Sequence, residues 1–233
     1  MAKKEDKKAD ILENPEVIAE KLEGAENWIE RHPGVVIGFA SVLLLAVAGY
    51  FGWNYYNDGQ NAEAQNEMFQ AIYYFEADSL NQALNGDGNN LGFLDIIDDY
   101  GFTDAGNLAN FYAGACYLKK GQYEAAILHL EDFQASDLLV QARAYSLIGD
   151  AHMEQGHFDD AASFYSKAAG YEPNKEFTPT YLMKAALAFE KAGNSDKAKE
   201  AYQTVIDKLL GFGRSAKTRK NSRRSWKPNH KES

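Results

Sequence analysis

Three columns of small residues recur along the second half of the chain at spacings of 35 and 37 residues. Each predicted unit holds an apolar helix, a glycine-centred turn and a second helix with an alanine at the point of closest approach. A fixed period of this length is the signature of repeat architectures, in which each unit stacks against its neighbours. We therefore predict an all-α solenoid. The columns are Gly114, Gly149 and Ala186; Gly121, Gly156 and Gly193; and Ala126, Ala161 and Ala198.

Larger side chains recur with the same spacing, at positions that would fill the space between units. Tyr117, His152 and Phe189 share one such column, and Pro173 closes the second unit. The pattern resembles the tetratricopeptide repeat over about Leu108–Leu210. The resemblance implies three repeats in residues 105–210, preceded by a degenerate or capping helical unit in residues 62–104.

The segment before the repeats carries helical signals of its own. Apolar residues at helical spacing predict one helix over Ala62–Leu84 and a short helix over about Leu91–Tyr100. Asp104 is the predicted N-cap of the helix that follows. The one cysteine of the chain, Cys116, excludes an intramolecular disulfide, and its apolar helical context predicts a buried small residue rather than a reactive thiol.

Twenty uncharged residues, Gly34–Trp53, precede the solenoid. A helix that rises about 1.5 Å per residue crosses the roughly 30 Å hydrocarbon core of a bilayer in this length. Trp53 and the tyrosines after it suit the membrane interface. Ala46-Val47-Ala48 also matches a signal-peptide cleavage site, but the apolar run continues beyond it and the region before the run is long and net acidic. We therefore predict an uncleaved transmembrane helix over residues 34–53.

The basic residues on the two sides of this span predict its orientation. Residues 1–33 hold six Lys and Arg, whereas residues 54–118 hold none. The positive-inside rule then keeps residues 1–33 in the cytoplasm and translocates the solenoid. Ile18, Leu22, Ala25 and Ile29 form one apolar stripe on a predicted amphipathic helix, which either lies near the membrane surface or docks a cytosolic partner.

The layout of the chain carries a second resemblance. A short cytoplasmic segment, one span that ends in Gly52-Trp53-Asn54-Tyr55-Tyr56-Asn57 and a translocated repeat domain resemble the ancillary SecYEG translocon subunit family. The stretches NEMFQAIYYFEADSLNQAL, GFLDIIDDYG and AGNLANFYAG are similar to tetratricopeptide membrane proteins of the Bacteroidota. These resemblances imply a single-pass protein of the bacterial inner membrane with a periplasmic domain, and the translocon and periplasmic chaperones or clients as protein partners.

The last 23 residues, 211–233, break the repeat pattern and carry eight basic residues against one acidic residue. They could form a basic arm for nucleic acid or anionic lipid, a disordered tail, or non-native sequence from a change of reading frame. We favour the second and third interpretations and predict no nucleic-acid partner, because the predicted topology exports this tail.

No catalytic constellation stands out among the titratable residues. His152 and His157 are five residues apart, which does not put them on one helical face, and the sequence between them is not H-E-x-x-H. Asp95, Asp98 and Asp99 lack the spacing of a calcium loop. We therefore predict no enzyme activity, no cofactor and no metal site.

Function is then expected on a surface. In tetratricopeptide repeats the first helix of each unit lines a concave groove. The residues at the corresponding positions of this chain favour an extended or helical apolar segment as ligand. The alternative is that these residues only pack against a neighbouring helix. We expect a membrane-anchored scaffold or chaperone-like adaptor near the Sec translocon, with an assembly factor for another cell-envelope complex as the alternative and an enzyme as the contrasting class. The predicted groove residues are Leu108, Phe111, Ala115 and Leu118 in the first unit, Arg143, Ser146, Asp150 and Met153 in the second, and Thr180, Met183, Leu187 and Glu190 in the third.

Overall fold

The computed structural model describes residues 28–135 and 138–207, and all regular secondary structure in them is helical. The chain divides into two compact units, Met1–Tyr56 and Asn57–Ser233. Most of the predicted amphipathic helix and the whole basic tail lie outside the described residues. The all-α prediction is confirmed for the described part of the chain.

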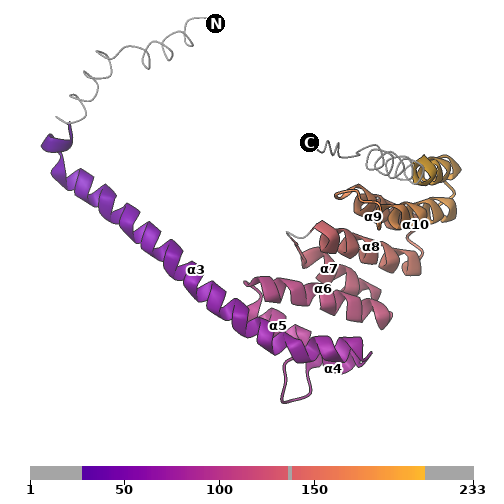
Figure 1. Ribbon diagram of the computed structural model, residues 1–233, viewed down its shortest axis with the longest axis horizontal. Helices are drawn as coiled ribbons and strands as arrows, with labels where there is room; N and C mark the ends of the chain where they lie inside the picture. The colour runs from indigo at the N-terminus through magenta and orange to yellow at the C-terminus, as the bar shows by residue number, and fades with distance from the viewer. Residues whose placement is uncertain (1–27, 136–137, 208–233) are drawn as a thin grey trace, which may run out of the picture. The chain divides into compact units, whose positions relative to one another are not determined.

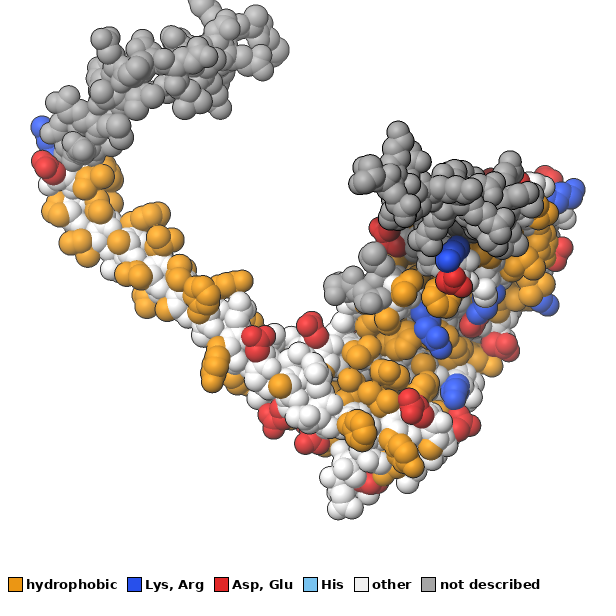
Figure 2. Space-filling model, viewed as in Figure 1, with side chains coloured by type: hydrophobic (Ala, Val, Ile, Leu, Met, Phe, Trp, Pro, Cys, Tyr) orange, Lys and Arg blue, Asp and Glu red, His pale blue; other side chains and the backbone are white. Residues whose placement is uncertain are grey.

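Helix α3 (Pro33–Glu76) begins in the first unit and ends in the second. By length and composition it is the one helix of the described residues that could cross a membrane, and no residue of its most apolar stretch is buried. Figure 2 shows hydrophobic side chains all along this part of the helix. The sequence predicted separate helices over residues 34–53 and 62–84. The two form one continuous helix up to Glu76 instead, which the absence of proline from residues 34–76 permits.

The helix predicted over 62–84 is interrupted at residues 77–79. The chain leaves the helix at Asp78, whose φ is +58°, and starts a new helix, α4 (Leu80–Asn85). Helix α5 (Phe93–Tyr100) follows, close to the predicted bounds. The N-cap of the next helix is Thr103 rather than Asp104, since the Thr103 hydroxyl accepts a hydrogen bond from the Gly106 N–H at 3.0 Å.

Five further helices stack in chain order, each packed against the one before it (Figure 1). The first two repeat units are the pairs α6–α7 and α8–α9. The third begins with α10 and continues in a helix over residues 195–207. The bounds are α6 (Asp104–Lys119), α7 (Tyr123–Asp132), α8 (Leu138–Gln155), α9 (Phe158–Gly170) and α10 (Thr178–Lys191).

The glycine turn of each unit has the same backbone geometry. Gly121, Gly156 and Gly193 have φ between +72° and +78°, a conformation that costs glycine little and other residues more. In all three turns the N–H after the glycine donates to a carbonyl five residues back, at 2.8–2.9 Å, as in a Schellman motif. The predicted column of turn glycines is therefore confirmed.

The column of close approach is confirmed as well. A Cβ atom on Gly114 would lie 2.5 Å from Cγ of Leu130, and one on Gly149 would lie 2.7 Å from the ring of Tyr165. The facing alanines of the second helices, Ala126 and Ala161, are fully buried. The first helix of each of these units has no side chain at this point, which leaves room for Leu130 or Tyr165 of the second helix.

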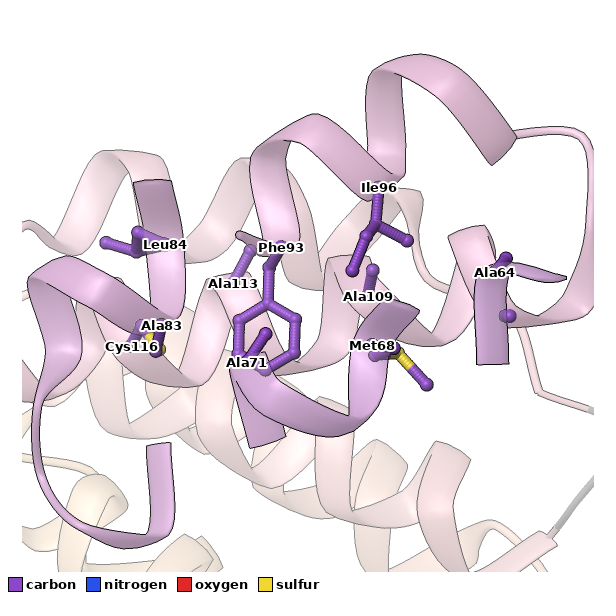
Figure 3. Close-up of a cluster of buried hydrophobic side chains, with 11 residues drawn as sticks. Ala64, Met68, Ala71, Ala83, Leu84, Phe93, Ile96, Ala109, Ala113 and Cys116 are labelled. Atoms are coloured by element: carbon purple, nitrogen blue, oxygen red, sulfur yellow. The ribbon is translucent and has the colours of Figure 1, made fainter. Parts of the chain in front are cut away.

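The helices before the repeats share a core with the first repeat. Figure 3 shows side chains from α3, α4, α5 and α6 meeting in one cluster, which includes Met68, Phe93 and Ile96. Cys116 belongs to this cluster and is fully buried, and burial raises the pKa of its thiol to about 12. The thiol therefore stays protonated and inert, as the sequence predicted.

We expect Gly149→Ala to destabilise the fold by about 1–3 kcal/mol, because the added methyl group meets the buried Tyr165 ring. Gly170→Ala is the matched control, since nothing lies within 4 Å of a Cβ there and the change should be neutral or slightly stabilising. Urea unfolding of the full chain in detergent, followed by circular dichroism, measures both. Equal stability of the two variants would contradict the assigned close approach.

Candidate functional site

The face formed by α6, α8 and α10 holds two neighbouring hollows. The α6–α8 hollow measures about 540 Å³ and the α8–α10 hollow about 430 Å³. Val140, Arg143 and Leu147 of α8 line both, so the hollows form one continuous surface, which we call the groove. Figure 2 shows hydrophobic side chains gathered on the helical stack, with basic and acidic side chains among them.

Seven of the twelve predicted groove residues line these hollows. They are Leu108, Phe111, Ala115 and Leu118 on α6, and Arg143, Ser146 and Asp150 on α8. Met153 is instead partly buried against the core that contains Tyr165 and Ala185.

The four residues predicted on the third unit do not line either hollow. Thr180, Met183, Leu187 and Glu190 are exposed on α10, where Met183 and Leu187 keep 47% and 45% of their surface. Helix α10 instead turns a different stripe toward α8, namely Phe177, Tyr181 and Lys184.

The residues that α10 contributes follow from the way the units stack. Each hollow lies between two successive units, and it is lined by the predicted groove positions of the first unit and by a different set of positions of the second. Val140 and Phe177 are 37 residues apart, as are Leu147 and Lys184, so they are equivalent positions in successive units. The sequence held this signal as two further columns at the repeat spacing, which the groove prediction missed.

Most residues that line the α6–α8 hollow are apolar, and its charged lining residues are Glu76, Lys119 and Arg143. Leu108, Ala115, Leu118 and Leu147 line it, together with Phe111. Phe111 is only 8% exposed, and its ring lies 5.3 Å from that of Phe133. It therefore belongs to the core as much as to the groove.

The α8–α10 hollow holds a polar network. Lys184 Nζ lies 2.8 Å from both carboxylate oxygens of Asp150 and donates to the Ser146 hydroxyl at 3.3 Å. The Tyr165 hydroxyl donates to the same carboxylate at 2.6 Å. Burial, and then this hydrogen bond to Asp150, raise the pKa of Tyr165 well above its ordinary value.

Arg143 gives the groove a cation without an internal counterion. It is exposed on α8, and no carboxylate of residues 28–135 or 138–207 lies within ion-pair distance of it. Its charge lowers the pKa of Tyr181, which burial raises by more. Because Asp150 is matched by Lys184, the net charge in this hollow comes from Arg143. An apolar floor beside an exposed guanidinium can bind a chain segment.

Comparisons with known proteins agree with this geometry. A family model described as a tetratricopeptide repeat-like domain matches residues 26–217. The crystal structure of MamA protein is similar in fold, with a TM-score of 0.52 at 18% identity, over 67% of this chain and 78% of that one. No curated protein matches the sequence.

We expect Tyr165→Phe to cost about 1–2 kcal/mol of stability, because it removes a buried hydroxyl from a charged acceptor that keeps Lys184 as its other partner. Tyr202→Phe is the matched control: its hydroxyl donates to exposed Glu190 at 3.2 Å, so the change should stay within about 0.5 kcal/mol. Chemical unfolding at neutral pH compares the two.

The parent chain and Tyr165→Phe also give a test of pH dependence. The pKa of Tyr165 lies above 10.0 in the folded chain, so its contribution is complete below pH 10 and is lost as the pH rises beyond it, where the unfolded chain ionises first. Stability should thus fall more steeply above pH 10 in the parent chain than in Tyr165→Phe. If the free energy of unfolding of the two proteins fell in parallel above pH 10, the assignment of Tyr165 as a buried hydroxyl would be contradicted.

Proposed function

Because the chain belongs to the tetratricopeptide repeat-like domain family, we propose that it is a protein-binding scaffold whose partner docks in the groove. One observation carries the proposal, namely that the mostly apolar α6–α8 hollow and the α8–α10 hollow, which holds the Asp150–Lys184 ion pair, join through shared residues of α8. A surface of this kind suits an extended or helical segment that inserts apolar side chains at one end. We propose that an acidic group of the segment meets Arg143.

We propose further that the scaffold is membrane-anchored through Gly34–Trp53, with its N-terminus in the cytoplasm and the solenoid in the periplasm of a bacterial inner membrane. The length and exposed apolar surface of this part of α3 support an anchor. The six basic residues before the span, against none in residues 54–118, support the orientation.

The layout of span and repeat domain favours a place near the Sec translocon, as an adaptor for periplasmic chaperones or clients. An assembly factor for another envelope complex has the same layout and is the alternative. Membership of a repeat family that binds proteins favours binding over catalysis. A pull-down from solubilised membranes of the source organism separates the two candidates: SecY among the partners supports the translocon, and an outer-membrane assembly machine supports the alternative.

Two substitutions test whether the groove is the route of capture. Leu118→Ser and Arg143→Glu change its apolar floor and its free charge without touching the core clusters. Each should weaken partner capture by about tenfold, or about 1.4 kcal/mol. Leu128→Ser is the matched control, because Leu128 is 59% exposed on α7 and lines neither hollow. Quantitative pull-down with the four proteins measures the effect, and capture that survives both groove changes would refute the proposal.

Orientation has its own test. A reporter that is active only in the periplasm should be active when fused after Asn57 and silent when fused before Arg31, because the basic residues precede the span. The opposite pattern would remove the translocon adaptor from consideration, although groove binding would stand. Intact mass of the purified protein shows at the same time whether the span is retained.

A further inference from the structure

The turn between α8 and α9 brings together three side chains that are typical metal ligands. His152 lies in the last turn of α8, His157 is the N-cap of α9, and Asp160 lies in the first turn of α9. One ligand atom from each lies within 4.8 Å of the other two. None of the three lines the groove, so this cluster is separate from the proposed docking surface.

The chain reversal at Gly156 explains why the sequence pattern missed this cluster. Two histidines five residues apart point in different directions on one continuous helix. Here Gly156, with φ of +78°, ends α8 and turns the chain back, so that the two imidazole rings lie 6.0 Å apart between centroids. The side chains are neighbours across a turn rather than along a helix.

His152 is fixed in place and carries unused hydrogen-bonding capacity. Its ring stacks on Phe164 at 5.4 Å, and its Nδ1 atom is buried and has no hydrogen-bond partner in the described part of the chain.

We propose that His152, His157 and Asp160 bind a divalent transition metal ion of the Zn²⁺ type. Imidazole nitrogen and carboxylate oxygen are ordinary zinc ligands, and three protein ligands leave a fourth position for water or a side chain of a partner. Nitrogen and oxygen ligands bound tetrahedrally at about 2.0–2.2 Å from zinc lie about 3.3–3.6 Å from one another. The three ligand atoms, which lie within 4.8 Å of one another, reach that separation by rotation of the His157 and Asp160 side chains, which are both exposed.

The other two repeats indicate that the turn itself does not require these residues. The positions of His157 and Asp160 correspond to Gln122 and Ala125 in the first unit. In the third unit they correspond to Asn194 and Lys197. All three turns have the same hydrogen-bond pattern, so only the middle unit combines that geometry with a set of metal ligands. A bound ion would tie the end of α8 to the start of α9.

The two other units also supply substitutions that keep the fold. His157→Gln and Asp160→Ala convert the middle turn to the residues of the first unit, and neither side chain is part of the core. His32→Gln is the matched control, since it removes an exposed histidine from outside the cluster. The protein is the full chain in detergent, without a polyhistidine tag and stripped of metal with a chelator.

Isothermal titration with Zn²⁺, and the visible absorption of added Co²⁺, measure binding. The parent chain and His32→Gln should bind one ion with the same affinity, with a Co²⁺ spectrum of low coordination number and a raised unfolding midpoint. His157→Gln and Asp160→Ala should each bind about tenfold or more weakly and lose the rise in midpoint. The proposal is overturned if the parent chain binds no ion at submillimolar Zn²⁺, if His157→Gln binds as tightly as the parent, or if His32→Gln weakens binding equally.

Discussion

The close approach of the two helices within each unit is the constraint on which the rest of this structure depends. In the second unit Gly149 lets the Tyr165 ring lie against the backbone of α8, and in the first unit Gly114 does the same for Leu130. Tyr165 is then held where its hydroxyl reaches Asp150. The packing that closes the unit therefore also fixes the carboxylate that receives Lys184 from α10. Through these contacts, the absence of a side chain at Gly149 of α8 determines how the polar residues of the α8–α10 hollow are oriented.

The groove, in turn, belongs to pairs of units rather than to any single one. Its α6–α8 hollow needs Leu147 from the second unit, and its α8–α10 hollow needs Tyr181 and Lys184 from the third. A repeat stabilised only by its neighbours thus provides binding surface only when those neighbours are in place. Loss of stacking at one interface would open a hollow as well as weaken the fold, so stability and capture are coupled in this chain.

The sequence predicted the features that depend on local backbone and volume. A glycine at a turn with positive φ, such as Gly121, or facing a buried ring, such as Gly149, leaves a periodic mark that survives when other positions vary. It did not predict that α3 runs on to Glu76, nor that the turn after it holds Asp78, a non-glycine residue with positive φ. Those outcomes depend on how the preceding helices pack against α6, and no local pattern records that packing.

The positions of the functional side chains likewise depend on packing between units, which the sequence pattern does not record. Helix α10 is oriented about its axis so that Lys184, and not Met183, lies beside Asp150. This orientation follows from packing between units, and it changes which residues of the third unit line the groove. The middle unit keeps the small residues at both packing columns while it carries the groove carboxylate, the free Arg143 and the histidine pair. The packing columns occupy only a few positions of each repeat, so that exposed positions of the middle unit can carry polar and charged side chains. The unit supported on both sides is where a polar network is tolerated best, since both neighbours contribute to its stability.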